Sequence, residues 1–232
     1  MKKVFMFMVF VAMAFATGCD KKGDRIDDNG DSDSHGYIDM GLPSGTLWAT
    51  CNVGAENPVE CGYYFAWGET EEGRNTWNSY KYANGSWNKL TKYCSVSEFG
   101  DNGFTDTLTV LLPEDDAVTV NWGDGWRTPT RAEFEELQNN CTVTWTYDYG
   151  VYGYRFTASN GNILFFPAVG CRWNWFLRSV DPHGCYWSSS LSNNDPSGVW
   201  ALNFCSSECS VDCNDFRCCG FTVRPVRSAP KK

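Results

Sequence analysis

Cysteine placement is the feature that most restricts how this chain can fold. Seven of its twelve cysteines lie after residue 170, and five of those fall within residues 205–219. Side chains two residues apart on an extended strand point to the same face of a sheet. Residues 205–213 therefore predict a strand or loop with two different faces. One face carries small or polar residues, and the other carries Cys205, Ser207, Cys209, Val211 and Cys213.

Three interpretations of these cysteines are open: a metal site, a disulfide framework, or an exposed binding face. Structural zinc favours C-x2-C pairs, whereas the spacing here is C-x3-C-x3-C, and the chain has only two histidines. Dense disulfides serve small domains without a core, whereas 11 Trp, 11 Tyr and 15 Phe supply a core here. An exposed face explains the alternation and the number of cysteines together. We expect a few opportunistic disulfides, Cys218 and Cys219 on opposite faces, and no metal or other cofactor.

The N-terminus has the composition of a secretory signal. Two lysines precede the apolar run Val4–Phe15, which is too short to span a bilayer, and Ala16-Thr17-Gly18-Cys19 follows. This ending resembles a bacterial lipobox, in which the cysteine becomes the lipidated first residue. We therefore expect a signal peptide at 1–18, then a lipidated Cys19 and a disordered acidic tether over 19–36. The acidic stretch resembles the surface-export signals of Bacteroidetes lipoproteins, which implies lipid anchoring in the outer membrane at the cell surface.

Residues 37–228 are long enough for one domain with a substantial core, before a short tail at 229–232. Frequent aromatic residues and glycines, with little helical periodicity, predict an α+β domain of short antiparallel strands and long ordered loops. The formal charge of −9 argues against a nucleic-acid partner, because phosphate binding needs clustered Lys and Arg.

Turn residues place the expected strands. A Pro-Ser-Gly turn within residues 37–53 predicts a hairpin, Gly62–Gly68 predicts an aromatic strand, and residues 69–100 predict a loop. Only strands and loops are expected after residue 142, with the strands at 143–147, 152–158, 163–166, 185–190, 199–204 and 221–226.

Two helices are also expected. Pro113 and the three acids after it suit the first turn of a short helix that runs towards Trp122. Thr130 and Glu133 form a capping box, which predicts the start of a longer helix.

Long segments of the chain carry a family likeness: DMGLPSGTLWATCNVGA, YYFAWGE, NWGDGWRTPTRAEFEEL, YWSSSL and the terminal GFTVRPVR. They resemble secreted Bacteroidetes lipoproteins related to the Fibrobacter succinogenes major paralogous domain, over nearly all of residues 37–227. The resemblance implies a C-type-lectin-like fold, related to the formylglycine-generating enzyme domain.

Some members of this group resemble variable proteins of diversity-generating retroelements, which rewrite the end of a lectin-like domain at template adenines. This chain departs from the usual Asn- and Tyr-rich text between YWSSSL and VRPVR, since Cys, Val, Asp and Phe stand there within an intact frame. Asn codons ending in a pyrimidine reach those residues, and Tyr codons reach Cys, through changes at adenine alone. Glu208 is not reachable in this way, which counts against a uniform scheme.

The resemblance and the alternation together predict a surface-displayed lipoprotein, not an enzyme, that binds an extracellular protein or glycan through a hypervariable face. Aromatic and Arg side chains in the Gly- and Pro-bounded stretch after residue 170 suit interface anchors on an exposed loop. The predicted ligand-binding residues are Cys171, Trp173, Trp175, Phe176, Arg178, Val180, Cys185, Cys205, Ser207, Cys209, Val211, Cys213, Asp215, Phe216, Cys218 and Cys219. The frame residues expected to pack inside are Trp187, Leu202, Phe204, Phe221 and Val223.

Two other functions stay open. One is an invariant structural or adhesive envelope lipoprotein. The other is a copper-dependent oxidase of the formylglycine-generating type, for which Cys205 or Cys209 are the nearest cysteines by region. The chain has no nucleophile elbow, no His pair spaced for a metal and no phosphate-cradling Gly loop, so the sequence gives catalysis little support.

Two acidic clusters offer oxygen ligands of the kind that calcium uses. They are Asp101-Asn102-Gly103 with Asp106, and Glu114-Asp115-Asp116. Such clusters are more often solvated surfaces or charges at a helix N-terminus, and we prefer that interpretation.

Substitution Cys19→Ala is expected to release the protein from membranes, because the lipid on that sulfur would be its only anchor. Fractionation of cells that express each form, followed by immunodetection, measures the effect. Retention of the variant in the membrane fraction would contradict lipidation at this residue.

Overall fold

The computed structural model describes residues 35–229, except residues 74, 124, 175, 179, 181 and 193 and the side chains of residues 213 and 214. The expected signal peptide, Cys19 and the tether up to residue 34 lie outside the described residues. So do Trp175 and the side chain of Cys213. None of the described helices has the length and apolar composition that crossing a bilayer requires.

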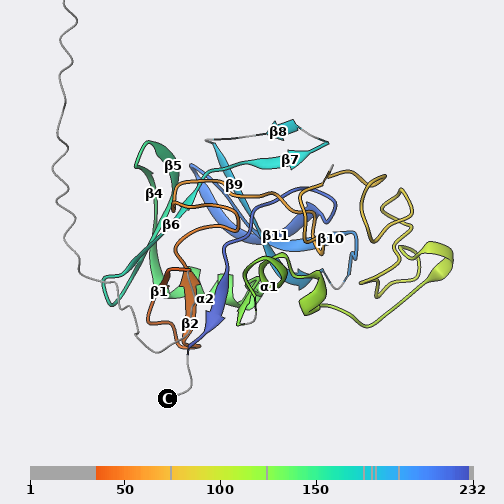
Figure 1. Ribbon diagram of the computed structural model, residues 1–232, viewed down its shortest axis with the longest axis horizontal. Coiled ribbons are helices and arrows are strands. Elements are labelled where there is room, and N and C mark those ends of the chain that lie inside the picture. The colour runs from red at the N-terminus through yellow and green to blue at the C-terminus, as the bar shows by residue number, and fades with distance from the viewer. Residues whose placement is uncertain are drawn as a thin grey trace, which may run out of the picture. The chain divides into compact units, whose positions relative to one another are not determined.

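The described residues form an α+β structure that is mostly antiparallel sheet (Figure 1). Every pair of named strands that share a ladder is antiparallel. The helical elements are η1 (Asp101–Gly103), η2 (Pro113–Asp115), α1 (Ala117–Trp122) and α2 (Arg131–Asn140). The strands are β1 (Tyr37–Asp39), β2 (Thr46–Ala49), β3 (Trp126–Arg127), β4 (Cys141–Asp148), β5 (Val151–Ala158), β6 (Ile163–Pro167), β7 (Cys171–Trp173), β8 (Phe176–Arg178), β9 (His183–Leu191), β10 (Gly198–Cys205), β11 (Glu208–Phe216) and β12 (Val226–Ser228).

The first sheet joins the two ends of the domain. Its strand order is β1-β2-β12-β3, so the last described strand lies between two strands that come much earlier in the chain. Val226 of β12 pairs with Trp48 on one side and with Arg127 on the other. Strands β1 and β2 confirm the hairpin predicted within residues 37–53.

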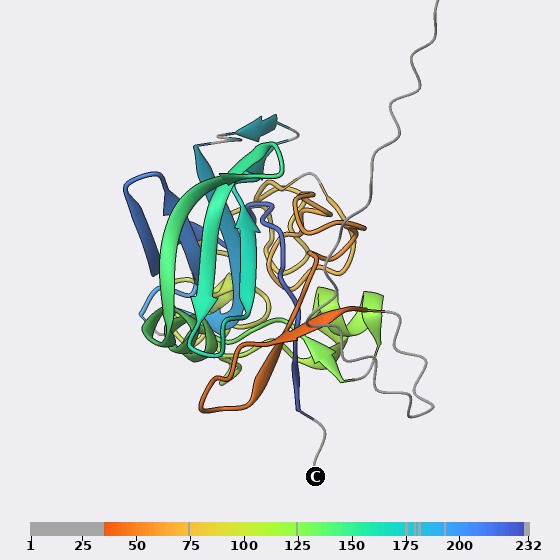
Figure 2. The ribbon, with the colours of Figure 1, turned by 90° about the vertical axis from the view of Figure 1, so that its left-hand side faces the viewer.

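Two further sheets enclose a core that we call the sandwich core. Sheet β4-β5-β6 lies across sheet β9-β10-β11, and α2 sits at their lower end (Figure 2). The capping box confirms the predicted start of α2, with the Thr130 Oγ accepting from the Glu133 backbone. The buried residues of this core include Trp48, Phe134, Leu137, Phe156, Phe166, Tyr186, Leu202 and Phe204.

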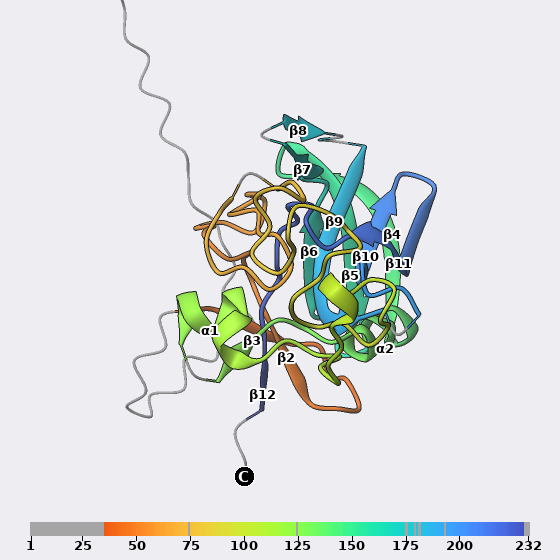
Figure 3. The same cartoon turned by 90° about the vertical axis from the view of Figure 1, so that its right-hand side faces the viewer.

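A second core, which we call the loop core, lies under the long loops of the first half of the domain (Figure 3). The predicted loop over residues 69–100 is confirmed, since its described residues form only isolated bridges. The aromatic strand predicted at Gly62–Gly68 is wrong, because both glycines take a positive φ and only Phe65 makes a bridge, to Phe221. The buried residues of the loop core include Trp67, Tyr80, Tyr93, Trp187, Cys218, Phe221 and Val223.

The five frame residues that were expected inside are all buried, which confirms that prediction. The short helix expected before Trp122 is also confirmed, as η2 followed by α1. Asp116 caps α1 by accepting from the Val118 backbone, and it accepts from the Thr128 backbone and hydroxyl as well.

Arg217 is fully buried and forms no ion pair among the described residues. Its guanidinium donates to the Tyr80 hydroxyl at 2.7 Å, and to the carbonyl oxygens of Lys92, Tyr93 and Pro196 at 2.9, 2.9 and 3.1 Å. A charged group without such partners is very costly to bury, so these acceptors make the position possible.

Arg224 is a second buried arginine of the C-terminal segment. It donates to Asn52 Oδ1 at 2.8 Å and to the carbonyl oxygens of Thr50 and Ala49 at 2.6 and 3.2 Å. Burial lowers the pKa of this guanidinium. Together the two arginines tie the end of the chain to loops of its first half.

Substitution Arg217→Met is expected to lower the free energy of unfolding by at least about 3 kcal/mol, because stranded buried acceptors cost about 1–3 kcal/mol each. The melting temperature should fall by roughly 6–12 °C for a domain of this size. Arg131→Met is the control: it removes a partly exposed pair with Glu135 and a cation–π contact on Trp200, which together contribute about 1 kcal/mol. Equal melting temperatures for the two variants would refute the role assigned to Arg217.

Candidate functional site

The β10–β11 hairpin reverses at Ser206 and Ser207, and this turn decides which cysteines share a face. Cys205 pairs with Glu208 across the turn, so these two side chains point to the same side of the sheet. Cys209, one residue further on, points to the opposite side. The predicted common face is therefore wrong, because a turn interrupts the strand that was expected to carry Cys205, Ser207, Cys209, Val211 and Cys213.

Cys209 and Val211 face the sandwich core. They pair with Phe204 and Leu202 and pack against that core. Gln138 of α2 donates its Nε2 to the Cys209 carbonyl oxygen at 3.0 Å and lies 3.4 Å from the Cys209 Sγ. Burial raises the pKa of the Cys209 thiol to about 11. These two predicted contact residues therefore help to hold the hairpin on the domain.

Cys205 and Ser207 lie at the free end of the same hairpin. The Cys205 Sγ is 3.3 Å from the Ser207 Oγ, and hydrogen bonds from Ser207 hold the pKa of this thiol below its usual value. Cys205 is partly exposed and Ser207 is exposed, so both remain available to a ligand.

The other side of the hairpin carries a polar network that we call the polar face. Asn203 Nδ2 donates to Asp212 Oδ1 at 2.9 Å and to Asp215 Oδ2 at 2.6 Å, and Ser210 Oγ donates to Asp212 Oδ2 at 3.0 Å. Cys185 joins this face as the partner of Asn203 in β9. Burial raises the pKa of the Asp215 carboxyl, and the nearby Asp212 charge adds to the shift.

Sequence reasoning missed three members of the polar face: Asn203, Ser210 and Asp212. The signal that would have found them is the pair of small residues Ser206 and Ser207 between two alternating segments, which suits a two-residue hairpin loop.

The stretch after Gly170 forms a second hairpin, β7–β8, instead of the expected loop (Figure 1). Trp173 pairs with Phe176 at its end and Cys171 with Arg178 at its base. The strands form because Arg172 exchanges backbone hydrogen bonds with Gly220, at 2.7 and 2.9 Å, which holds β7 against the C-terminal segment.

The expected exposure of this stretch is confirmed for its second half. Phe176 is 67% exposed, Leu177 47% and Val180 45%, and Arg178 is exposed as well. Trp173 is half-buried and packs against the loop core.

Phe216, at the end of β11, connects the two hairpins. Its ring centroid lies 6.5 Å from that of Trp173 and 5.8 Å from that of Trp77, and the side chain is 45% exposed. The fold thus places aromatic residues of β7 and β11 side by side, as the binding-face hypothesis requires of Trp173 and Phe216.

Four cysteines gather where β7, β9 and the segment after β11 meet. The Cys171 and Cys185 thiols are close enough that their interaction raises the pKa of Cys185 and lowers that of Cys171. The interaction of Cys219 with Cys218, together with burial, raises the pKa of Cys219. All four are free thiols in the structure, so none of the expected disulfides is present among them.

Two predictions about the vicinal pair are therefore wrong. Cys218 was expected on the exposed binding face, but it is fully buried in the loop core because the chain turns inward after Phe216 to bury Arg217. Cys218 and Cys219 were expected on opposite faces and not bonded to each other; both are free thiols, but both pack on the loop core.

The acidic clusters serve the fold. Asp106 accepts from the backbones of Tyr93, Cys94 and Leu108. Asp115 is buried among Tyr82, Tyr93 and Lys92, whose hydrogen bonds hold the pKa of its carboxyl below the usual value against the opposing effect of burial. Across the described ranges, no three His, Cys, Asp or Glu side chains come together in a way that could hold a metal ion.

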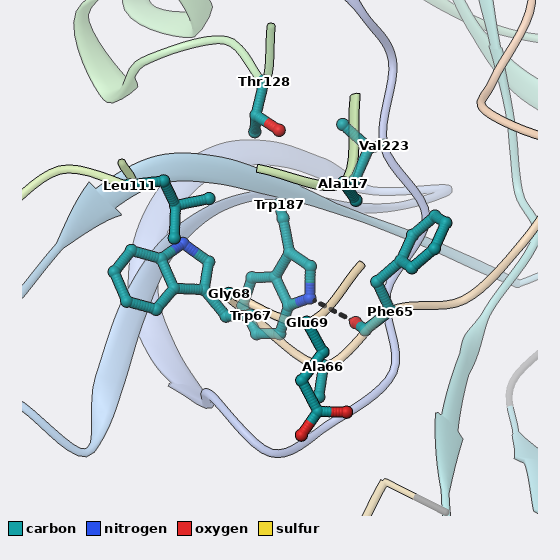
Figure 4. Close-up of a pocket in the computed structure, with 10 residues that line it drawn as sticks. All are labelled: Phe65, Ala66, Trp67, Gly68, Glu69, Leu111, Ala117, Thr128, Trp187 and Val223. Atoms are coloured by element: carbon teal, nitrogen blue, oxygen red, sulfur yellow. Dashed lines mark hydrogen bonds between the residues drawn. The ribbon is translucent and has the colours of Figure 1, made fainter. Parts of the chain in front are cut away.

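Figure 4 shows a pocket lined almost entirely by buried aromatic and apolar groups of the loop core, among them Phe65, Trp67, Trp187 and Val223. Trp187 Nε1 donates to the Phe65 carbonyl oxygen across it, at 2.8 Å. The space is no larger than about one water molecule, so it is a packing gap of the core.

Comparisons of the chain with protein-family models, with curated proteins and with solved structures find no significant match.

Substitution Cys218→Ser is expected to lower the free energy of unfolding by about 1–3 kcal/mol, because it places a hydroxyl in an apolar site. Cys205→Ser is the matched control at the free end of the hairpin and should cost under about 0.5 kcal/mol. Urea unfolding of both variants measures the difference. A Cys218→Ser variant as stable as the control would contradict the core position of Cys218.

Proposed function

We propose that this chain is a lipid-anchored, surface-displayed binding protein with a C-type-lectin-like domain. Its ligand is an extracellular protein or glycan, and the β7–β8 hairpin supplies the principal contacts. The observation that carries the proposal is the group of exposed side chains Phe176, Leu177, Arg178 and Val180 on a short hairpin. Exposed apolar groups beside an arginine are the usual anchors of an interface.

Contacts of Arg172 with Glu72 and Tyr64 hold the first strand of the hairpin and support this proposal. Arg172 Nη1 lies 3.0 Å from Glu72 Oε1, and its guanidinium stacks 4.8 Å from the Tyr64 ring centroid. Ordering a contact hairpin before binding reduces the entropy lost on association. The contact surface would continue over Phe216, the half-buried polar face and the Cys205–Ser207 end of the β10–β11 hairpin.

The anchoring, the cell-surface location and the lectin-like fold rest on the family resemblance and on the N-terminal sequence. Retroelement diversification rests on the intact frame around the substituted positions, and the burial of that frame is compatible with it. Side-chain changes on the polar face and on β8 would then alter affinity with little effect on stability.

One observation favours the alternative of an invariant envelope lipoprotein. Cys209, Val211 and Cys218 lie in the proposed variable segment, yet they pack against the two cores. A reverse-transcriptase gene beside a near-copy of the coding segment for residues 171–227, differing at adenines, would favour diversification over this alternative.

The oxidase alternative needs a close cysteine pair to hold copper. Cys205 and Cys209 lie on opposite faces of their hairpin, whereas Cys171 and Cys185 contact each other. Copper-dependent oxidation of a thiol substrate by the purified chain would favour this function.

Substitutions Phe176→Ser and Arg178→Ser are each expected to weaken ligand binding by about 2 kcal/mol or more, roughly 30-fold, as for buried interface anchors. A glycan array and a panel of extracellular proteins, probed with the purified full chain, provide the ligand and the measurement. The control is Tyr149→Ser on the β4–β5 turn, a residue 86% exposed, which should bind as the parent does. Unchanged binding by both hairpin variants, with melting temperatures intact, would refute the proposed contact surface.

A further inference from the structure

An isolated bridge links the residue before β7 to β9, next to Cys171 and Cys185. Gly170 forms a parallel bridge with Gly184, and the Gly170 N–H donates to the His183 carbonyl oxygen at 2.8 Å. The next residues in this parallel register are Cys171 and Cys185, two free cysteines whose thiols are close enough to shift each other's pKa. Neighbouring strands lie about 4.8 Å apart, which is within the roughly 4.4–6.8 Å between Cα atoms of ordinary disulfides.

The other cysteines are worse placed to bond with this pair. The antiparallel bridge between Arg172 and Gly220 sets Cys219 opposite Trp173, so Cys219 is a diagonal neighbour of Cys171. Cys205 pairs with His183 and is in the same way diagonal to Cys185. Diagonal neighbours are about 7–8 Å apart, beyond the usual disulfide distance.

The vicinal pair Cys218 and Cys219 is also poorly suited to bond internally. Consecutive Cα atoms are about 3.8 Å apart across a trans peptide. That separation is below the usual range of about 4.4–6.8 Å for disulfides, so a bond between these two neighbours would be strained.

We propose that Cys171 and Cys185 form a disulfide that fastens the base of the β7–β8 hairpin to β9. The oxidant is a disulfide, either a small molecule or an oxidoreductase of the compartment that receives the chain. One protein thiolate attacks the oxidant's disulfide and releases its first thiol; the second protein thiolate then displaces the other. One S–S bond forms and one breaks, the two protein thiols are oxidised, and the oxidant is reduced to two thiols.

Cys171 suits the attacking role, because the neighbouring Cys185 lowers the pKa of its thiol and so favours the thiolate. The bond would close the segment from 171 to 185, which contains all of β8 with its exposed Phe176 and Arg178. Closing such a segment restricts its opened conformations. The inference rests on the positions of the two thiols and is independent of whether the hairpin binds a ligand.

The test uses the full chain, purified under reducing conditions and then equilibrated with a mixture of oxidised and reduced glutathione. Free thiols are alkylated, and peptide mapping without reduction identifies each bond. We expect the 171–185 bond in the parent and in the control Cys205→Ser, and its loss in Cys171→Ser and Cys185→Ser.

Limited trypsin digestion provides a second measurement that needs no substitution. Cleavage after Arg178 should be about tenfold slower in the oxidised parent than in the reduced parent, because the bond restrains the hairpin. The proposal is overturned if both thiols stay open to alkylation after oxidation, or if either cysteine is bonded to a different one. It is also overturned if oxidation leaves the cleavage rate at Arg178 unchanged.

Discussion

The buried guanidinium of Arg217 is the interaction on which the functional half of the fold depends. It follows directly on Phe216, so the end of β11 is fixed relative to two separate loops that supply its acceptors, residues 69–100 and the β9–β10 connection. Removing a guanidinium from water is favourable only where its N–H groups find partners, and here most of them are main-chain carbonyls. The rings of Trp67, Tyr80 and Tyr93 surround the charge and add cation–π attraction. The inward turn that buries Arg217 also carries Cys218 into the loop core.

Within β11, some residues support the fold, whereas others can contact a ligand. Side chains of β11 that meet Phe204 and Leu202 are held by packing, whereas those that meet Asn203 form hydrogen bonds on a half-buried surface. A segment of this kind can change its surface chemistry at some positions only. The cysteines of this chain occupy positions of both kinds, so their number alone does not define a binding surface.

Much of the fold follows from local sequence signals. The capping box at Thr130, the hairpin within residues 37–53 and the strands expected between residues 143 and 204 were predictable because turn residues and alternation act over a few positions. The strand expected at 221–226 is wrong, because residues 220–222 form only isolated bridges to three different segments and β12 begins at Val226. The Gly62–Gly68 segment was mistaken for a strand because its glycines adopt positive φ values that aromatic content does not reveal. The site was harder to predict, because the register of β10 and β11 depends on a two-residue turn. An error of one residue in that register moves every side chain of the strand to the other face of the sheet. The contact between Cys171 and Cys185 depends on distant strands and has no local signal.

The position of β12 has a consequence for how the molecule is made. This strand is the last that the structure describes, yet it lies between β2 and β3, so both of its partners are made long before it. Pairings so distant in sequence form slowly, because a long loop must close before any contact stabilises it. Until β12 is made, the edges of β2 and β3 that it covers stay unpaired on the growing chain, at risk of aggregation. Completion of the first sheet is therefore a late event that depends on β12.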